Sequence, residues 1–103
     1  MKIKVTPEGR DGVWIADKES VMDFLHNYET KQIHNFNPGG GLIIGCDWDK
    51  KSVINKVKEA ERIAVLTGDS FRHNLKHSLS VIAGNKLHMF DVGELTESDL
   101  LVT

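Results

Sequence analysis

Cysteine is nearly absent from this sequence, because Cys46 is the only one in 103 residues. A single cysteine excludes an intramolecular disulfide and a cysteine-based zinc cage. Long apolar runs are also missing, and the first segment, MKIKVTPEGR, alternates polar and apolar residues instead of forming the apolar centre of a signal peptide. The sequence therefore predicts a protein of a reducing, cytoplasmic compartment, in a cell or an infected host, with no membrane partner.

An excess of charge of one sign is absent as well. The chain has 13 basic and 15 acidic residues, for a formal net charge of -2 at pH 7. A charge this small gives no general attraction to nucleic acid or to an anionic membrane, so recognition through charge must be local. The hydrophobic share of 40% and the charged share of 27% are typical of a globular protein. We expect residues 1–103 to form one α/β domain.

The amino-terminal residues have the pattern of a β-hairpin. The runs KIKVT at 2–6 and GVWIA at 12–16 are β-type, and turn-forming residues separate them. Alternation along both runs predicts one apolar face made of Ile3, Val5, Val13 and Ile15. Trp14 is then expected on the opposite face.

Further along, segments of helical and strand type alternate. Apolar residues at helical spacing predict a helix from Asp17 to Tyr28, a second over residues 50–61 with Asp49 as its N-cap, and a third over DSFRHNLKHSLSVIAG, which ends at Gly84. Apolar runs predict buried strands over residues 41–48, 62–68 and 86–92. Residues 29–41 predict a long glycine-rich loop, with a short edge strand at 33–36 as the alternative. The tail, 93–103, fits either a helical turn or an edge segment.

This order of elements indicates an α/β fold. A hairpin followed by β-α-β units predicts a mixed, mostly parallel five-stranded sheet with about three helices.

A basic ridge on the third expected helix is the first candidate for a functional surface. Arg72, His73, Lys76 and His77 would lie together on the outer side of that helix. Such a ridge fits a non-catalytic binding or regulatory protein with a macromolecular partner, as in accessory proteins of phages and mobile elements. An exposed Trp48 or Trp14 would add an aromatic anchor, and the glycine-rich loop would add contact surface.

The nature of the partner follows from the same ridge. The ridge could bind an acidic protein, phosphate or RNA, or be only the solvated face of a helix. A protein is the favoured partner, since no aromatic residue is interleaved with the basic ones for base stacking. Nucleic acid stays a weaker alternative. Self-association through an open sheet edge is a further expectation.

Carboxylates at the predicted strand ends give an alternative of another class, a small metal- or phosphate-dependent enzyme. Its residues would be Asp47, Asp49, Asp69, Ser70 and Asp91, gathered at the carboxyl ends of parallel strands. Helix capping is the simpler explanation for Asp49 and Asp69.

Other chemical motifs are incomplete, so we expect neither a cofactor nor a metal. His73 and His77 would be one helical turn apart, but Asn74 stands where a zinc hydrolase has glutamate. The glycines of NPGGGLIIG precede a strand instead of following one, unlike a phosphate-binding loop. Cys46 is expected to be a buried, inert thiol, and His88 a partly buried structural histidine.

Overall fold

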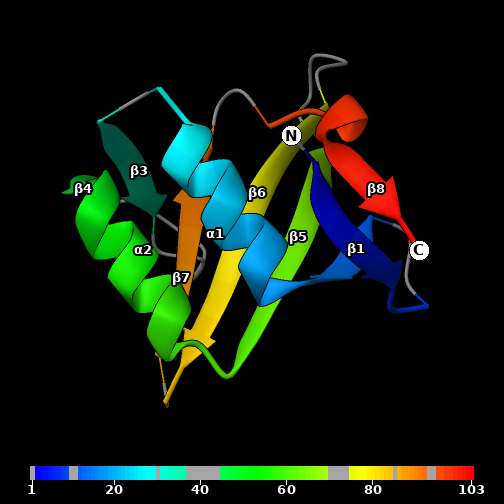
Figure 1. Cartoon of the computed structure of the whole chain (residues 1–103), viewed down its shortest axis with the longest axis horizontal. Coiled ribbons are helices and arrows are strands. Elements are labelled where there is room, and N and C mark those ends of the chain that lie inside the picture. Colours follow the sequence, from blue (N-terminus) through cyan, green and yellow to red (C-terminus); the bar gives the residue numbers. More distant parts are fainter. Residues whose placement is uncertain are drawn as a thin grey trace.

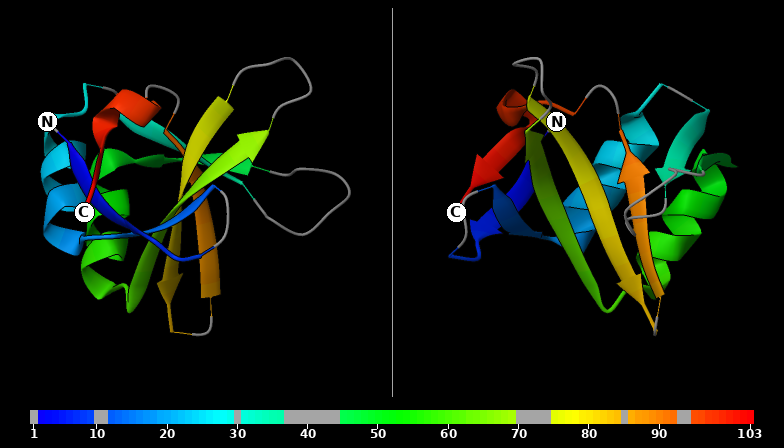
Figure 2. Two further views of the ribbon diagram at one scale, coloured as in Figure 1. Left: turned by 90° about the vertical axis from the view of Figure 1, so that its right-hand side faces the viewer. Right: turned by 180° about the vertical axis from the view of Figure 1, so that it is seen from behind.

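The computed structural model describes residues 2–9, 12–29, 31–36, 45–69, 75–84, 86–92 and 95–103. Its centre is one eight-stranded sheet with the strand order β4-β3-β7-β6-β5-β2-β1-β8. Helices α1, Lys18–Asn27, and α2, Lys50–Glu59, both lie on the same face of that sheet (Figures 1 and 2). Among the described residues, no α-helix lies over the other face, which the view from behind in Figure 2 shows. In the described part of the chain, no helix is long and apolar enough to cross a membrane.

The strands are mostly joined as antiparallel neighbours. They are β1 Ile3–Pro7, β2 Val13–Ala16, β3 Gln32–Phe36, β4 Gly45–Asp49, β5 Arg62–Asp69, β6 Leu75–Ala83, β7 Lys86–Asp91 and β8 Leu100–Val102. Only β1 and β8 pair in parallel. The expected mostly parallel five-stranded sheet with three helices is therefore wrong. The prediction fails because β5, β6 and β7 follow one another as hairpin partners, so no helical crossover is needed to bring these strands together.

The third expected helix is wrong because its second half is strand β6. Phe71, Leu75, Leu79 and Ile82 fit helical spacing, but the run from Leu75 also alternates with period two. In the fold, β6 pairs with β5 on one side and β7 on the other, and Leu79 and Val81 are completely buried. Gly84, expected to end a helix, instead has a φ of +63° in the turn between β6 and β7.

The first hairpin forms as expected, but the two faces of β2 are the reverse of those predicted. β1 and β2 are antiparallel, with Val5 opposite Ala16 and Pro7 opposite Trp14. Side chains directly opposite each other share a face, so Trp14 joins Ile3 and Val5 beneath the helices. Val13 and Ile15 take the uncovered face. The loop length sets this register, and sequence alternation alone does not reveal it.

Of the expected N-caps, Asp49 is confirmed, and Asp17 takes the position for which Ser20 was the alternative, but Asp69 caps no helix because it is the last residue of strand β5. Asp17 caps α1 by accepting a hydrogen bond from the backbone N–H of Ser20, and Asp49 caps α2 by accepting one from the N–H of Ser52. The buried Ser20 side chain then links helix to sheet, because its Oγ accepts from Lys4 N–H at 3.0 Å and donates to Asp17 O at 2.8 Å.

The core lies between the helices and the sheet. The expected inward stripe of α2 is confirmed, since Val53, Ile54, Val57 and Ala60 are all buried. From α1, Val21, Phe24 and Leu25 join it, and the strands add further apolar side chains: Ile3, Val5, Ile33, Ile63, Val65, Leu79, Val81, Phe90 and Leu100. These contacts fix both helices over the middle of the sheet.

Two further expectations concern the sheet edges. The alternative of a strand at 33–36 is correct, although β3 is not an edge, because β4 pairs with its outer side. The run at 41–48 was expected to be buried on both faces, but its described part forms the edge strand β4, and Cys46 is exposed. The tail contains both expected forms, a short 3-10 turn, Glu97–Asp99, and then β8.

Candidate functional site

A basic groove runs between the end of α1 and the beginning of α2. Its volume is about 540 Å³, and its lining residues are His26, Glu29, Lys31, Asp49, Lys50, Lys51, Ile54, Asn55 and Lys58. Four lysines face two carboxylates there, so the groove is positively charged although the whole chain is slightly negative. Clefts lined by one sign of charge concentrate ligands of the other sign. We call this site the α1–α2 groove.

Lys50 has a structural role within the α1–α2 groove. Its ammonium donates to the backbone oxygens of His26 at 3.0 Å and Tyr28 at 2.7 Å, at the carboxyl end of α1. A cation at that position satisfies carbonyls left unpaired by the helix end and interacts favourably with the helix dipole. Its backbone N–H also donates to Lys31 O at 2.8 Å, which holds Lys31 beside the start of α2.

Three other lysines of the groove have no such use. In the part of the chain that the structure describes, the ammonium groups of Lys31, Lys51 and Lys58 form no ion pair with a carboxylate. Lys51 also stands in the first turn of α2, which holds no acidic residue. A cation there meets the partial positive charge of the helix amino terminus, which the N-cap carboxylate of Asp49 offsets in part. Such an arrangement concentrates positive potential where an anionic group would lower the free energy.

The side chain of Lys56 faces a different neighbourhood on α2. Its ammonium lies 5.9 Å from the ring centroid of Trp48 and 3.5 Å from a carboxylate oxygen of Glu59. Trp48, the expected anchor, is half-buried and packs against the rings of His88 and Phe90, each at 5.4 Å between centroids. Trp14 is half-buried too and packs against the core. Neither tryptophan is an exposed anchor.

The residues expected to form the basic ridge do not share a helix. Arg72 and His73 lie outside the described residues, while Lys76 and His77 are neighbours on β6, with their side chains outside the description. Successive residues of a strand point to opposite faces, so Lys76 and His77 cannot form one surface in the way a helix would allow. Their part in partner binding stays a prediction. The glycine-rich loop also lies outside the described residues, apart from its ends.

The strand-end aspartates are only partly brought together. Asp47 and Asp91 lie opposite His34 from its two sides, on β4 and β7. Asp49 is occupied as a cap, and its hydrogen bonds from Ser52 lower the pKa of its carboxyl below the usual 3.8. Asp69 ends β5, three positions beyond Leu66. Leu66 lies opposite Ser78 on β6, and Ser78 lies opposite Asp91 on β7, so Asp69 is three positions beyond the row of Asp91. Ser70 lies outside the described residues. β4, β7 and β5 run in the same direction, but the antiparallel strands β3 and β6 lie between them, so successive aspartate-bearing strands are about 10 Å apart across the sheet and the expected gathering does not form.

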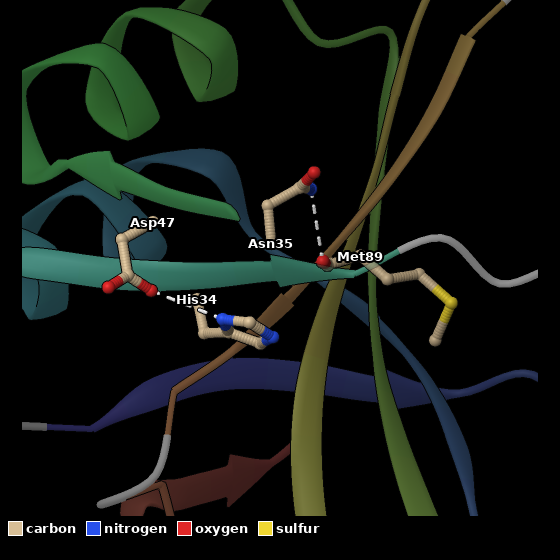
Figure 3. A network of polar contacts seen from close by, with 4 residues as sticks. All are labelled: His34, Asn35, Asp47 and Met89. Carbon is tan, nitrogen blue, oxygen red and sulfur yellow. Dashed lines mark hydrogen bonds and ion pairs between the residues drawn. The ribbon is translucent and has the colours of Figure 1, made fainter. Parts of the chain in front are cut away.

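His34 and Asp47 form an exposed polar pair on the uncovered face. His34 Nδ1 lies 3.1 Å from Asp47 Oδ1, as Figure 3 shows, while the neighbouring Asn35 donates from Nδ2 to Met89 O at 3.1 Å. A carboxylate beside an imidazole fixes the ring orientation, which is what a general base requires. Within the described residues, no group of three or more side chains is placed to hold a metal ion. The enzymatic alternative stays a prediction.

Comparisons with protein-family models, with curated proteins and with solved structures give no match. Function is therefore inferred here from the chemistry of this chain's own residues.

One signal for the α1–α2 groove was present in the sequence. The segment KKSVINKVK, residues 50–58, has four lysines and no acidic residue. Such a pattern usually marks the solvent-facing side of an amphipathic helix. The pattern does not reveal Lys31, which the pairing of β3 with β4 and the hydrogen bond from Lys50 N–H bring beside the start of α2.

Proposed function

We propose that this protein is a non-catalytic binding protein that recognises an acidic segment of a partner protein in the α1–α2 groove. The observation that carries the proposal is the set of three lysines without carboxylate partners in the described chain, Lys31, Lys51 and Lys58, around one groove. Charge complementarity of this kind steers a partner to the surface and selects its orientation.

The geometry of α2 favours an extended acidic segment over a single small anion. Lys51 and Lys58 are seven positions apart, which places them on the same side of the helix and about 10 Å apart along its axis. Ile54, one turn after Lys51, lines the groove between them with the small part of its side chain that the core leaves exposed. A partner segment with carboxylates at either end and an apolar residue between them matches this arrangement.

Nucleic acid fits the α1–α2 groove less well. No Phe, Tyr or Trp is among its described lining residues, so the His26 ring alone would have to serve for base stacking. Sequence-independent contacts with phosphates alone would remain, and these weaken steeply with salt. We therefore treat nucleic-acid binding as an outcome that the experiment must separate from peptide binding.

The test compares two fluorescently labelled probes by anisotropy, a glutamate-rich peptide with one central leucine and a single-stranded oligonucleotide of similar charge. We expect the wild type to bind the peptide, and the Lys51→Glu, Lys58→Glu double variant to lose at least about tenfold in affinity. Lys86→Glu is the matched control for the single variants Lys51→Glu and Lys58→Glu, since it changes the net charge by the same amount as each of them and does not line the groove. Circular dichroism checks that all variants are folded.

Three outcomes contradict the proposal. One is unchanged peptide binding by the double variant, and another is an equal loss in Lys86→Glu, which would show only general attraction. Stronger binding of the oligonucleotide than of the peptide would assign the groove to nucleic acid. Capture of native partners with Arg72→Glu, Lys76→Glu alongside the groove variant then tells which of the two basic surfaces the partner needs.

A further inference from the structure

β8 forms one outer edge of the sheet and pairs only with β1. Figure 1 shows it beside β1, on the opposite side of the sheet from β4. In the described part of the chain, no strand lies on the outer side of β8. Such an edge presents backbone donors and acceptors that can pair with another strand.

The direction of the backbone groups along β8 follows from its hydrogen bonds. Thr103 N–H donates to Val5 O at 2.9 Å, so the backbone of Thr103 points toward β1. Backbone groups alternate in direction along a strand, so those of Leu101 also point toward β1. The N–H and C=O groups of Leu100 and Val102 therefore point outward, two donors and two acceptors on a three-residue edge.

Exposed apolar side chains gather at the same edge. Leu101 is 43% exposed and Val102 is 56% exposed, and the only other large hydrophobic residue of the described chain with comparable exposure is Leu87 on β7, at 45%. No residue from Leu100 to Thr103 has a charged side chain. The opposite edge strand, β4, differs, because Asp47 and Asp49 would repel a second copy of that strand. Charged side chains are a common protection of sheet edges, and β8 has none.

We propose that β8 pairs with β8 of a second copy of this chain, antiparallel, about a twofold axis through Leu101. In this register Leu100 of each copy lies opposite Val102 of the other, and the outward groups of both residues form four backbone hydrogen bonds. The edge is its own complement, as a twofold interface requires.

The side chains match this pairing. Leu101 lies opposite Lys4 in the register, on the uncovered face, and meets Leu101 of the second copy at the axis. Val102 lies opposite Val5, on the helix-covered face, and meets the second copy's Leu100 there. Leu100 is already part of the core, so the exposed Val102 gains an apolar neighbour and the two cores become continuous. The interface is small, which predicts reversible association that depends on concentration.

The test is sedimentation velocity of the whole chain over a range of concentrations up to about 1 mM. We expect the wild-type mass to rise from 11.5 kDa toward twice that value. Leu101→Glu should stay monomeric, because two carboxylates would meet at the axis while each monomer keeps a favourable Glu–Lys4 pair. Leu87→Glu is the matched control and should associate as the wild type does.

A second variant tests the backbone contacts themselves. Val102→Pro removes an N–H that points outward, so it leaves the hydrogen bonds between β1 and β8 in place. We expect it to abolish association with an unchanged circular dichroism spectrum. A wild type that stays monomeric at every concentration overturns the proposal, as does association that Leu101→Glu and Val102→Pro leave intact. Loss of association in the Leu87→Glu variant alone would also overturn the proposal, because it would assign the contact between copies to the uncovered sheet face.

Discussion

At the scale of the single residue, His88 lies in surroundings that favour its neutral form. Its ring stacks on Phe90 and contacts Trp48, and its buried Nε2 has no hydrogen-bond partner in the described chain. Burial of the ring, with the nearby charges of Lys56 and Lys86, lowers the pKa of His88 below its usual 6.5. The positive form is disfavoured because it loses hydration and meets like charges.

This shift predicts how stability depends on pH. Below pH 6.5 the unfolded chain takes up a proton at His88 more readily than the folded chain does. The contribution of neutral His88 to the free energy of unfolding is therefore complete above 6.5 and is lost as the pH falls through the lower, folded-state pKa. We expect this loss in urea unfolding curves measured across the acidic range, and a pKa below 6.5 for His88 by NMR titration.

His88→Phe is the matching variant, since it keeps an aromatic ring between Trp48 and Phe90 and removes the titrating group. Its free energy of unfolding should change less with pH than that of the wild type. At neutral pH the variant should be at least as stable, because it no longer buries an unpaired nitrogen. Equal pH dependence in both proteins would show that His88 titrates normally.

At the scale of the element, the amino end of α1 depends on one side chain. Asp17 accepts the N–H of Ser20 at 3.1 Å and so pairs a backbone donor that the helix leaves free. We expect Asp17→Ala to lower the free energy of unfolding by about 1 kcal/mol, and Asp17→Asn to retain most of it, since asparagine also caps helices well. Chemical denaturation of the three proteins measures this, and an Asn variant as weak as the Ala variant would contradict it.

Elements governed by local interactions were predictable from the sequence, and those governed by pairing were not. Both helices and both aspartate caps follow from spacing and capping chemistry within a few residues. β6 was mistaken for a helix because Leu75 and Leu79 fit either period, and only pairing with β5 and β7 decides between them. The face of Trp14 was missed for the same reason, since register depends on the partner strand.

The candidate site was predictable only in its chemistry. A basic helix surface with an acidic partner was expected, but it was assigned to a helix through Lys76, which lies on strand β6. The groove also needs Lys31, which precedes β3 and comes beside α2 through the pairing of β3 with β4. Strand pairing is a contact between elements that local patterns do not specify.

At the scale of the whole molecule, the strand order predicts a gradient of protection. β5, β6 and β7 each have neighbours on both sides, whereas β4 and β8 are edges. Opening a central strand requires breaking two sets of hydrogen bonds, so its amides exchange only through large openings. Hydrogen exchange followed by NMR should find the slowest amides in β5–β7 and the fastest in β4 and β8. Similar protection for β4 and β6 would contradict this order.

The parallel pair of β1 and β8 also has a consequence for synthesis on the ribosome. β1 is the earliest strand of the fold to emerge, yet its outer neighbour comes far later, with Thr6 and Thr103 separated by 97 positions. Until β8 is translated, the backbone of Ile3 and Val5 has no partner on that side, and β1 itself is the open edge of any partly folded sheet. The nascent chain is thus most prone to pair with other chains just before its last strand is added.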